Sequence, residues 1–334
     1  MNSVERFKAV MNFQKPDRLP MIEWAHYWDK TVDRWHGEGL PAELVDAAEI
    51  RRYLGLDCYH QLWTGTRKDT CPSEPHHGAG IISDTGGYIK LKEHLYPEFR
   101  QQHRHGLDWL ADTACRQARG EVVFWISLDG FFWFPRVLLG IENHLYAFYD
   151  QPELMHAINR DLTDFHLRTL DSLCEICTPL FMTFGEDMSY NHGPMLSKTL
   201  FDEFIAPYYR RIVPALKERG IIPMIDSDGD VTTLIPWLEE AGIEGLLPLE
   251  RQSGVDVAQI RRCHPRFRMI GAFDKMVMNR GEQAIRGEFE RLLPVMRTGG
   301  FIPSVDHQTP PGVSLEQYKC YLRLLKEYAE LGAG

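Results

Sequence analysis

The sequence predicts an α/β fold, a (β/α)8 barrel of the TIM type with an insertion in its N-terminal third. Short apolar runs alternate with longer amphipathic segments, a pattern typical of βα units around a parallel sheet. The chain has 334 residues, a length that a single barrel domain reaches. No Ser-, Pro- or Gly-rich linker interrupts it. We therefore expect residues 1–334 to form one domain.

Eight apolar runs are the candidate strands. They are residues 18–24, 57–63, 121–128, 180–185, 221–226, 243–250, 267–273 and 301–306. The clearest helix between them is TLFDEFIAPYYRRIVPALKERG, residues 199–220, where apolar residues recur at spacings of three and four and Gly220 provides a stop.

Residues 64–118 break the alternation. The stretch IISDTGGYIKL, residues 81–91, has two glycines between runs that could pair, which indicates a hairpin. We expect residues 64–118 to be an inserted hairpin or lid over one end of the barrel.

Composition limits the classes of function. The net charge of -10 disfavours a nucleic-acid-binding surface, which needs an excess of Lys and Arg. The sequence contains neither a signal-peptide-like run at its start nor eighteen consecutive apolar residues. Seven cysteines, an odd number, suit reduced thiols. We expect a cytoplasmic protein with no membrane segment and no nucleic-acid partner.

Acidic residues follow the last five predicted strands. These residues are Glu186 and Asp187, Asp226 and Asp228, Glu250, Asp274, and Asp306 with His307. The carboxyl ends of barrel strands meet at one rim, where active sites lie. Each acid taken alone also fits a turn or a helix N-cap. As a set they indicate a site, with Glu186, Asp187, Asp226, Asp228 and His307 as the catalytic candidates.

Carboxylates crowded at such a rim must share protons, bind a cation or pair with a cationic substrate. Glu186, Asp226, Asp228 and His307 carry ligand types compatible with Zn, Mn or Mg, so these four residues are also the candidate metal ligands. No HExxH motif or pair of Cys ligands fixes a geometry.

Further residues are candidates for substrate binding. They are Glu23, His26, Asp84, Asp129, Phe132, Tyr190 and Asp306. Phe132 belongs to DGFFWFPRVLLG, residues 129–140, whose aromatic side chains fit either a barrel core or a flat wall for a ligand. No GxGxxG, GxxxxGK[ST] or GxSxG motif is present, which disfavours common nucleotide sites and a serine-hydrolase elbow.

Four stretches resemble the uroporphyrinogen decarboxylase superfamily. They are ERFKAVMNFQKPDRLPMIEW at residue 5, the block from FGEDMSYNHGPM to GLLPLE over residues 184–250, IGAFDKMVMNRG at residue 270 and FIPSVDHQTPPGVSLEQY at residue 301. The resemblance implies a TIM-type barrel. It also implies one of two chemistries, uroporphyrinogen decarboxylation or cobalamin-linked methyl transfer.

The decarboxylase branch carries an arginine-containing RQAGRY-like segment after the first strand. Here that stretch is EWAHYWDKT, with Glu23 and His26 and no arginine, so a substrate with eight carboxylates lacks its basic partners. The methyltransferase branch holds zinc on an HxC pair and a late Cys. Asp226 and Asp228 stand at the HxC positions, and the late position falls at Asp306 and His307, so the sulfur ligands are missing.

The resemblance therefore predicts a methyltransferase-like enzyme. It would move a methyl group between a small substrate and a corrinoid carried by a partner protein, with Zn or another divalent metal as a possible cofactor. One alternative is a cofactor-free lyase that decarboxylates its substrate with Asp84 or Asp129 handling the proton. Another is a non-catalytic protein that binds a tetrapyrrole or corrinoid.

Overall fold

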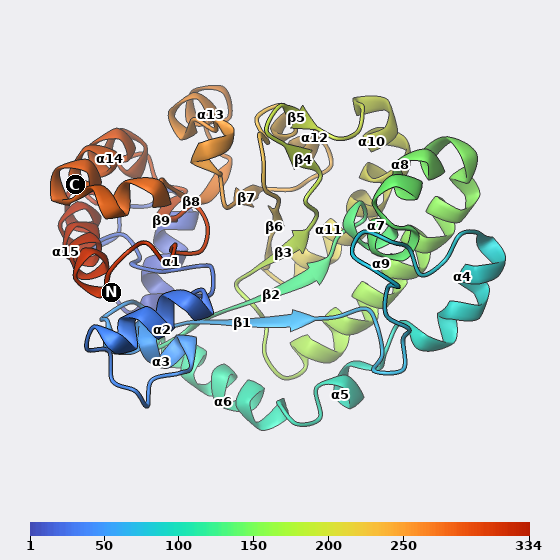
Figure 1. The fold of residues 1–334 in the computed structure, drawn as a ribbon, viewed down its shortest axis with the longest axis horizontal. Helices are drawn as coiled ribbons and strands as arrows, with labels where there is room; N and C mark the ends of the chain where they lie inside the picture. Colours follow the sequence, from blue (N-terminus) through green and yellow to red (C-terminus); the bar gives the residue numbers. More distant parts are fainter.

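The computed structural model describes residues 1–334 as a parallel β-sheet with α-helices packed outside it (Figure 1). Seven strands form the sheet in the order β1-β2-β3-β6-β7-β8-β9. Their bounds are β1 Tyr59–Thr64, β2 Val123–Asp129, β3 Phe181–Gly185, β6 Ile222–Asp226, β7 Gly245–Leu247, β8 Arg268–Phe273 and β9 Phe301–Val305. The short strands β4 Ser189–Tyr190 and β5 Gly193–Pro194 pair separately as an antiparallel hairpin.

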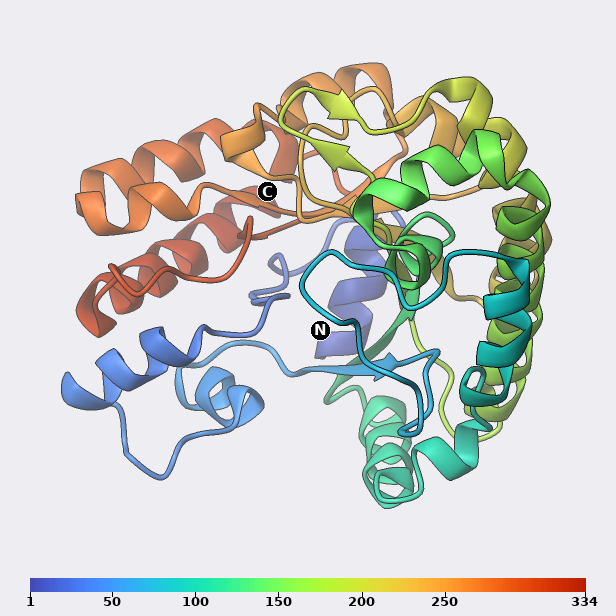
Figure 2. The ribbon, with the colours of Figure 1, turned by 45° about the vertical axis from the view of Figure 1, so that its right-hand side comes forward.

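The central strands are buried along nearly their whole length, as expected of a parallel sheet covered on both faces. In β2 every residue is buried except Asp129 at its end. The register pairs Asp129 with Gly185 and Gly185 with Asp226, so the carboxyl ends of β2, β3 and β6 lie level with one another. The sheet curls (Figure 2), which turns the residues at these ends toward a common space.

The prediction of eight strands is wrong at the first position. Residues 18–24 run between β9 and β1 without forming a ladder: the Asp57 amide donates to the Met21 carbonyl at 2.8 Å, while the Trp24 amide donates to the Ser304 hydroxyl at 3.4 Å. Pro20 has no N–H to contribute. The observed fold is therefore an α/β structure with a curled sheet of seven parallel strands, and the other seven predicted strands are confirmed.

Fifteen α-helices surround the sheet. They are α1 Ser3–Met11, α2 Asp29–Gly37, α3 Ala47–Tyr53, α4 Thr85–Leu91, α5 Phe99–Gln102, α6 Leu107–Ala118, α7 Trp133–Leu139, α8 Ile141–Asp150, α9 Pro152–Cys174, α10 Lys198–Phe204, α11 Ala206–Glu218, α12 Ile235–Glu240, α13 Val257–Cys263, α14 Glu282–Met296 and α15 Leu315–Gly332. Three 3-10 turns complete the chain, η1 Lys92–His94, η2 Arg251–Ser253 and η3 Lys275–Arg280.

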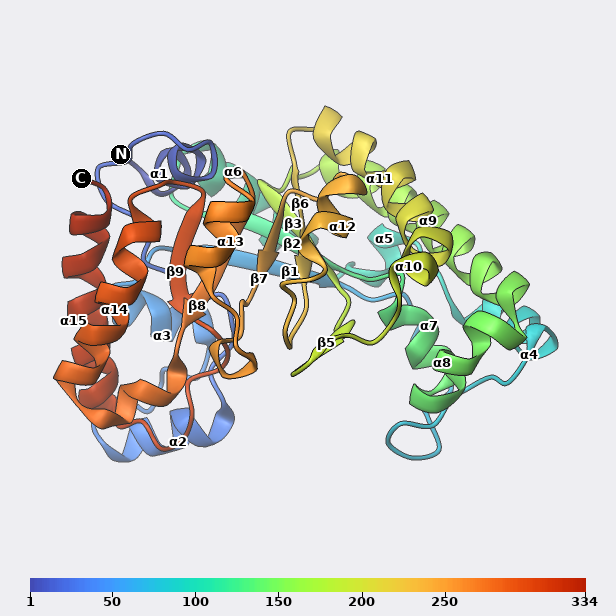
Figure 3. The same ribbon diagram turned by 90° about the horizontal axis from the view of Figure 1, so that it is seen from above.

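The helices bury apolar stripes against the sheet. Along α9, Leu154, Ile158, Leu162 and Phe165 recur at spacings of three and four and are all buried, the pattern of a helix with one core-facing side. Viewed from above, α14 and α15 flank one end of the sheet and α9 and α11 the other (Figure 3).

The predicted hairpin at residues 81–91 is also wrong, because residues 85–91 form α4. Asp84 is its N-cap, and its carboxylate accepts the Gly87 amide at 2.8 Å, a local bond that favours a helix start over a strand turn. The Tyr88 hydroxyl donates to Asp161 on α9 at 2.8 Å, so this part of the chain packs against a barrel helix.

The last residue of the chain lies beside its N-terminal segment, where the Lys15 ammonium donates to the Gly334 carbonyl at 3.3 Å. No helix combines the length and the apolar character that crossing a bilayer would require.

Candidate functional site

A cavity of about 250 Å³ lies at the carboxyl ends of the strands, the position of active sites in barrels. Its lining residues come from segments far apart in the chain and are Trp24, Trp63, Asp129, Trp133, Gly185, Asp187, Asp226, Asp228 and His307. Four of these nine residues are aspartates and none is Lys or Arg. Sites for drug-sized ligands span about 300–1,000 Å³, so this cavity suits a small ligand.

The sharp turn after β6 delivers two carboxylates to the cavity. Asp226 ends the strand, and Asp228 follows after the buried Ser227, whose hydroxyl accepts the Met188 amide at 3.2 Å. Gly229 has a φ of +86°, and a Cβ there would come within 2.8 Å of the Ser189 backbone. The turn packs so closely on the β4–β5 hairpin that only glycine fits.

The carboxylates of this turn lie close to other acids, and Asp226 has no cation beside it. Asp226 has no hydrogen-bond partner for its side chain, and burial, with Asp187 and Asp228 nearby, raises its pKa well above the usual value. Burial and then Asp187 raise the pKa of Asp228 to about 6, against the opposing charge of His307 at 3.7 Å. Carboxylates this crowded cannot all ionise without a cation or a shared proton.

Asp129 and Asp187 complete the acidic lining. Asp129 accepts the backbone amide and the hydroxyl of Thr66, while burial raises its pKa. Asp187 has a φ of +40°, a left-handed conformation uncommon outside glycine and concentrated at functional sites. Its Oδ1 accepts the Asp228 amide at 3.4 Å, which couples the loops after β3 and β6.

Glu186, predicted as catalytic residue and metal ligand, does not line the cavity. Its fully buried carboxylate accepts the amides of Phe131 and Phe132 at 2.7 Å each, the Trp133 amide at 3.1 Å and the Tyr209 hydroxyl. Burial raises its pKa to about 7 although these four donors lower it. Glu186 therefore anchors the start of α7, the segment that carries Trp133.

Two other predicted residues are buried around the site and do not line it. Glu23 accepts the hydroxyls of Ser304 and Tyr318 at 3.1 Å each, and burial raises its pKa to about 7. Asp306 accepts the amides of Arg251 at 3.0 Å and Lys275 at 3.3 Å. These carboxylates connect the segments that surround the cavity.

The remaining predicted residues lie outside the cavity lining. His26 is exposed, and Asp84 caps α4. Phe132 is fully buried and packs on His144 with ring centroids 4.6 Å apart, so it belongs to the core. Tyr190 is exposed on β4. The structure therefore brings together Asp129, Asp187, Asp226, Asp228 and His307 from the predicted set.

Two tryptophans of the lining, Trp24 and Trp63, were missed by the sequence reasoning, and the third, Trp133, was considered only as part of the aromatic stretch 129–140. Trp24 and Trp63 are the last residues of the predicted runs 18–24 and 57–63, and Trp133 follows Phe132. The strand-end position that singled out the acids could also have singled out Trp24 and Trp63. Lys275 was missed as well. Its positive charge opposes the rise in the pKa of Asp228, and its ammonium lies 3.6 Å from the Asp306 carboxylate.

The proposed metal ligands do not form a metal site. No group of three or more His, Cys, Asp or Glu side chains has an arrangement that could hold a metal ion. The Glu186 carboxylate is directed toward its own hydrogen-bond donors, so only Asp226, Asp228 and His307 of the four candidate ligands line the cavity. The seven cysteines are free and none lines the cavity, so the residues present do not fit a thiolate-bound zinc.

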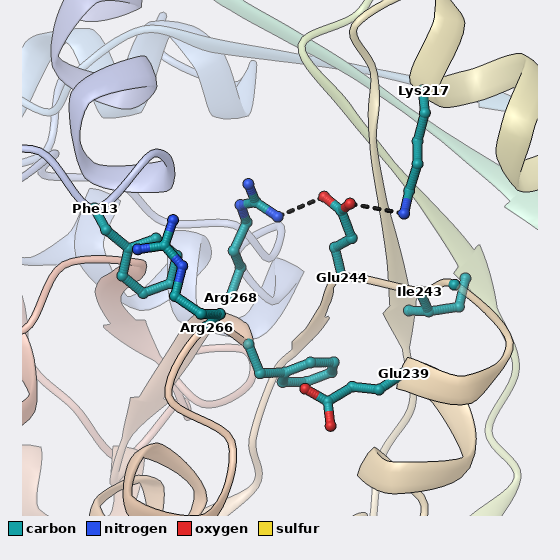
Figure 4. A pocket seen from close by; sticks show the side chains of 9 residues that line it. Phe13, Lys217, Glu239, Ile243, Glu244, Arg266 and Arg268 are labelled. Atoms are coloured by element: carbon teal, nitrogen blue, oxygen red, sulfur yellow. Dashed lines mark hydrogen bonds and ion pairs between the residues drawn. The ribbon is translucent and has the colours of Figure 1, made fainter.

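A second cavity, of about 370 Å³, lies at the opposite end of the strands. Its lining includes residues 242–244, which precede β7, and residues 266–268, which lead into and begin β8. Glu244 forms ion pairs with Arg268 and, at 2.8 Å, with Lys217, while the Arg266 guanidinium lies 4.0 Å from the centre of the Phe13 ring (Figure 4). Paired charges at the amino ends of strands are typical of a stabilising role.

Comparison with known proteins gives a family and a fold. The family model described as uroporphyrinogen decarboxylase (URO-D) matches residues 133–328. A solved methyltransferase from Methanosarcina mazei superposes with a TM-score of 0.70 at 14% identity, covering 98% of this chain and 99% of that one. A putative vitamin-B12-independent methionine synthase from Listeria monocytogenes covers 93% and 96% at 12% identity, with a TM-score of 0.48. No curated protein matches in sequence.

Proposed function

Because the chain belongs to the uroporphyrinogen decarboxylase (URO-D) family, we propose that it transfers a methyl group between a small methylated substrate and a corrinoid carried by a partner protein. The observation that supports this most is the lining of the cavity, which has four aspartates and no Lys or Arg. A solved protein of the same fold is a methyltransferase, which makes methyl transfer the activity to test first.

The same lining argues against a decarboxylase. A carboxylated substrate needs cationic partners, and here it would meet Asp187, Asp226 and Asp228 instead. A tetrapyrrole with eight carboxylates is also too large for a cavity of about 250 Å³. Methyl transfer from a small heteroatom compound makes neither demand.

In this mechanism Asp226 and Asp228 face the heteroatom that bears the methyl group. As the carbon–heteroatom bond breaks, its electron pair stays on the heteroatom, so groups that hold positive charge or a proton there favour departure. When bound, the partner's corrinoid would supply a reduced cobalt as the acceptor of the methyl group. Trp24 and Trp63 exclude water from the methyl group, and Glu186 holds the segment that presents Trp133.

The test measures methyl transfer to free cob(I)alamin through the change in visible absorbance of the cobalamin. Quaternary amines, methylamines and methyl ethers are supplied in turn. We expect turnover with one of these classes and a loss of about 10²-fold or more in the D226N/D228N variant, because the groups that hold positive charge or a proton at the heteroatom are removed. Asp256→Asn serves as the control. Asp256 caps α13 and does not line the cavity, and Asn is an equally good cap.

Absence of turnover with every class, from protein that is folded and from cobalamin that is reduced, would reject the methyltransferase proposal. Equal loss in D256N and in D226N/D228N would show that the aspartates act through folding and not through the reaction.

A further inference from the structure

We infer that the cavity at the carboxyl ends of the strands binds a methylated ammonium group, so the methyl group of the substrate sits on a cationic nitrogen. This inference rests on the proposed function and names its substrate class. The cavity combines two features that each favour a cation: aromatic walls and the Asp226 carboxylate, which has no cationic partner.

The aromatic walls come from three separate segments. Trp24 precedes β1, Trp63 is on β1, and Trp133 opens α7. Indole faces attract cations more strongly than other aromatic rings, and surrounding a cation with several such rings is the usual way in which proteins recognise quaternary ammonium groups. The Trp63 ring lies alongside Gly185, where an added Cβ would be in ordinary van der Waals contact with it at 3.9 Å.

One of the three indoles is already engaged by a cation. The Arg136 guanidinium lies 5.3 Å from the centre of the Trp133 ring, and its Nη1 donates to the Asp187 carbonyl at 3.4 Å. Trp24 stands edge-on to His307, with ring centroids 6.2 Å apart. Trp63 has no such partner, and its side chain is 51% exposed. It is therefore the wall that a ligand would cover most directly.

The carboxylates provide the second, independent feature. Asp226 is partly buried and lines the cavity, and its side-chain carboxylate accepts no hydrogen bond. A carboxylate enclosed by protein without a donor loses solvation that only a cation or a proton can replace. A quaternary nitrogen has no N–H to donate, and its diffuse charge is satisfied by nearby carboxylates and ring faces together, without a directed hydrogen bond.

The reaction balances with such a substrate. The carbon–nitrogen bond breaks, its electron pair remains on nitrogen as the lone pair of a neutral amine, and the methyl group forms its new bond with the electron pair of the reduced cobalt. No proton is needed for the departing amine, so this step does not depend on a proton donor in the cavity.

Calorimetric titration without any corrinoid tests the binding. Choline carries a trimethylammonium group, and 3,3-dimethylbutan-1-ol is its neutral isostere of nearly equal shape. We expect choline to bind and the neutral isostere to bind at least about tenfold more weakly. Trp63→Ala should weaken choline binding by about 3- to 30-fold, and Asp226→Asn should weaken it as well.

Trp28→Ala is the matched control, because Trp28 is 48% exposed and does not line the cavity. Thermal unfolding of each variant separates lost binding from lost structure. The inference is overturned if choline does not bind, if the isostere binds equally well, or if W63A and W28A bind choline alike. Turnover with neutral methyl ethers and none with ammonium compounds would also overturn it.

The outcomes separate the two proposals. Cation binding with the expected variant pattern but no transfer to cob(I)alamin from any substrate would reject the methyltransferase and leave the ammonium site standing. Transfer from a methyl ether by a protein that binds no ammonium compound would reject the ammonium site and leave the methyltransferase proposal standing.

Discussion

At the scale of single residues, Asp226 and Asp228 differ in what surrounds them. Asp226 has two acids and no cation acting on it, whereas Asp228 has His307 at 3.7 Å and the charge of Lys275 to offset Asp187 and Glu250. The pKa of Asp228 is raised to about 6, within the range of ordinary solution conditions. Asp228 is thus the carboxyl whose charge can be switched in an experiment.

Affinity for a methylated ammonium probe should therefore rise with pH. Below pH about 6 the Asp228 carboxyl is protonated and neutral, and above it the carboxylate attracts the cation. We expect choline to bind about tenfold more tightly at pH 7.5 than at pH 5, a gain set by one carboxylate charge. The measurement is the dissociation constant against pH.

In the Asp228→Asn variant this part of the pH dependence should disappear. A dependence that persists unchanged in D228N would assign the titration to another of the neighbouring groups, Asp187, Asp226, His307 or Glu250.

At the scale of elements, α7 depends on one buried carboxylate. Glu186 accepts three amides at the helix start, including that of Trp133. This close approach needs Gly130, where a Cβ would lie 2.1 Å from the Glu186 carboxyl carbon. Negative charge at a helix N-terminus is favourable, and here the same contact fixes one wall of the cavity.

Gly130→Ala should displace Glu186 and leave buried amides without an acceptor. Since each unsatisfied buried group costs about 1–3 kcal/mol, we expect a loss of about 3 kcal/mol or more in the free energy of unfolding, measured by urea titration. Gly287→Ala is the matched control. Gly287 is exposed within α14, and a methyl group added there would have nothing within 4 Å, so alanine should stabilise by about 0.5–1 kcal/mol. Equal effects at both positions would contradict the role of Glu186.

The elements also show what the sequence could and could not predict. Apolar runs located seven of the strands, and strand-end positions located Asp226, Asp228 and His307. Glu186 occupies a strand-end position too, yet its side chain turns toward the start of α7. Sequence position gives the rim and not the direction of a side chain, which depends on donors brought close only by folding. The same limit applies to Phe132 and Trp133, adjacent residues of which one is core and the other cavity wall.

At the scale of the whole molecule, the sheet has one irregular seam. Residues 18–24 occupy the position between β9 and β1 in the sheet, and they make few backbone hydrogen bonds there. The Trp24 indole N–H donates to the Val305 carbonyl at 2.8 Å, and the buried Glu23 accepts from Ser304 and Tyr318. At the seam, hydrogen bonds from side chains therefore replace the backbone ladder that joins neighbouring strands elsewhere in the sheet. Since Trp24 also lines the cavity, the seam and the site share a residue.

Hydrogen exchange should reveal this seam. Amides that lack ladder partners open with a smaller free energy than those of central strands, so we expect protection factors in residues 18–24 to be at least about tenfold lower than in β2, residues 123–129, a difference of about 1.4 kcal/mol or more. The measurement is exchange followed by mass spectrometry of peptides covering each segment. Trp24→Phe removes the bond to Val305 and should lower protection at the seam further while leaving β2 unchanged. Equal protection of the two segments would mean that residues 18–24 close the sheet as firmly as a regular strand.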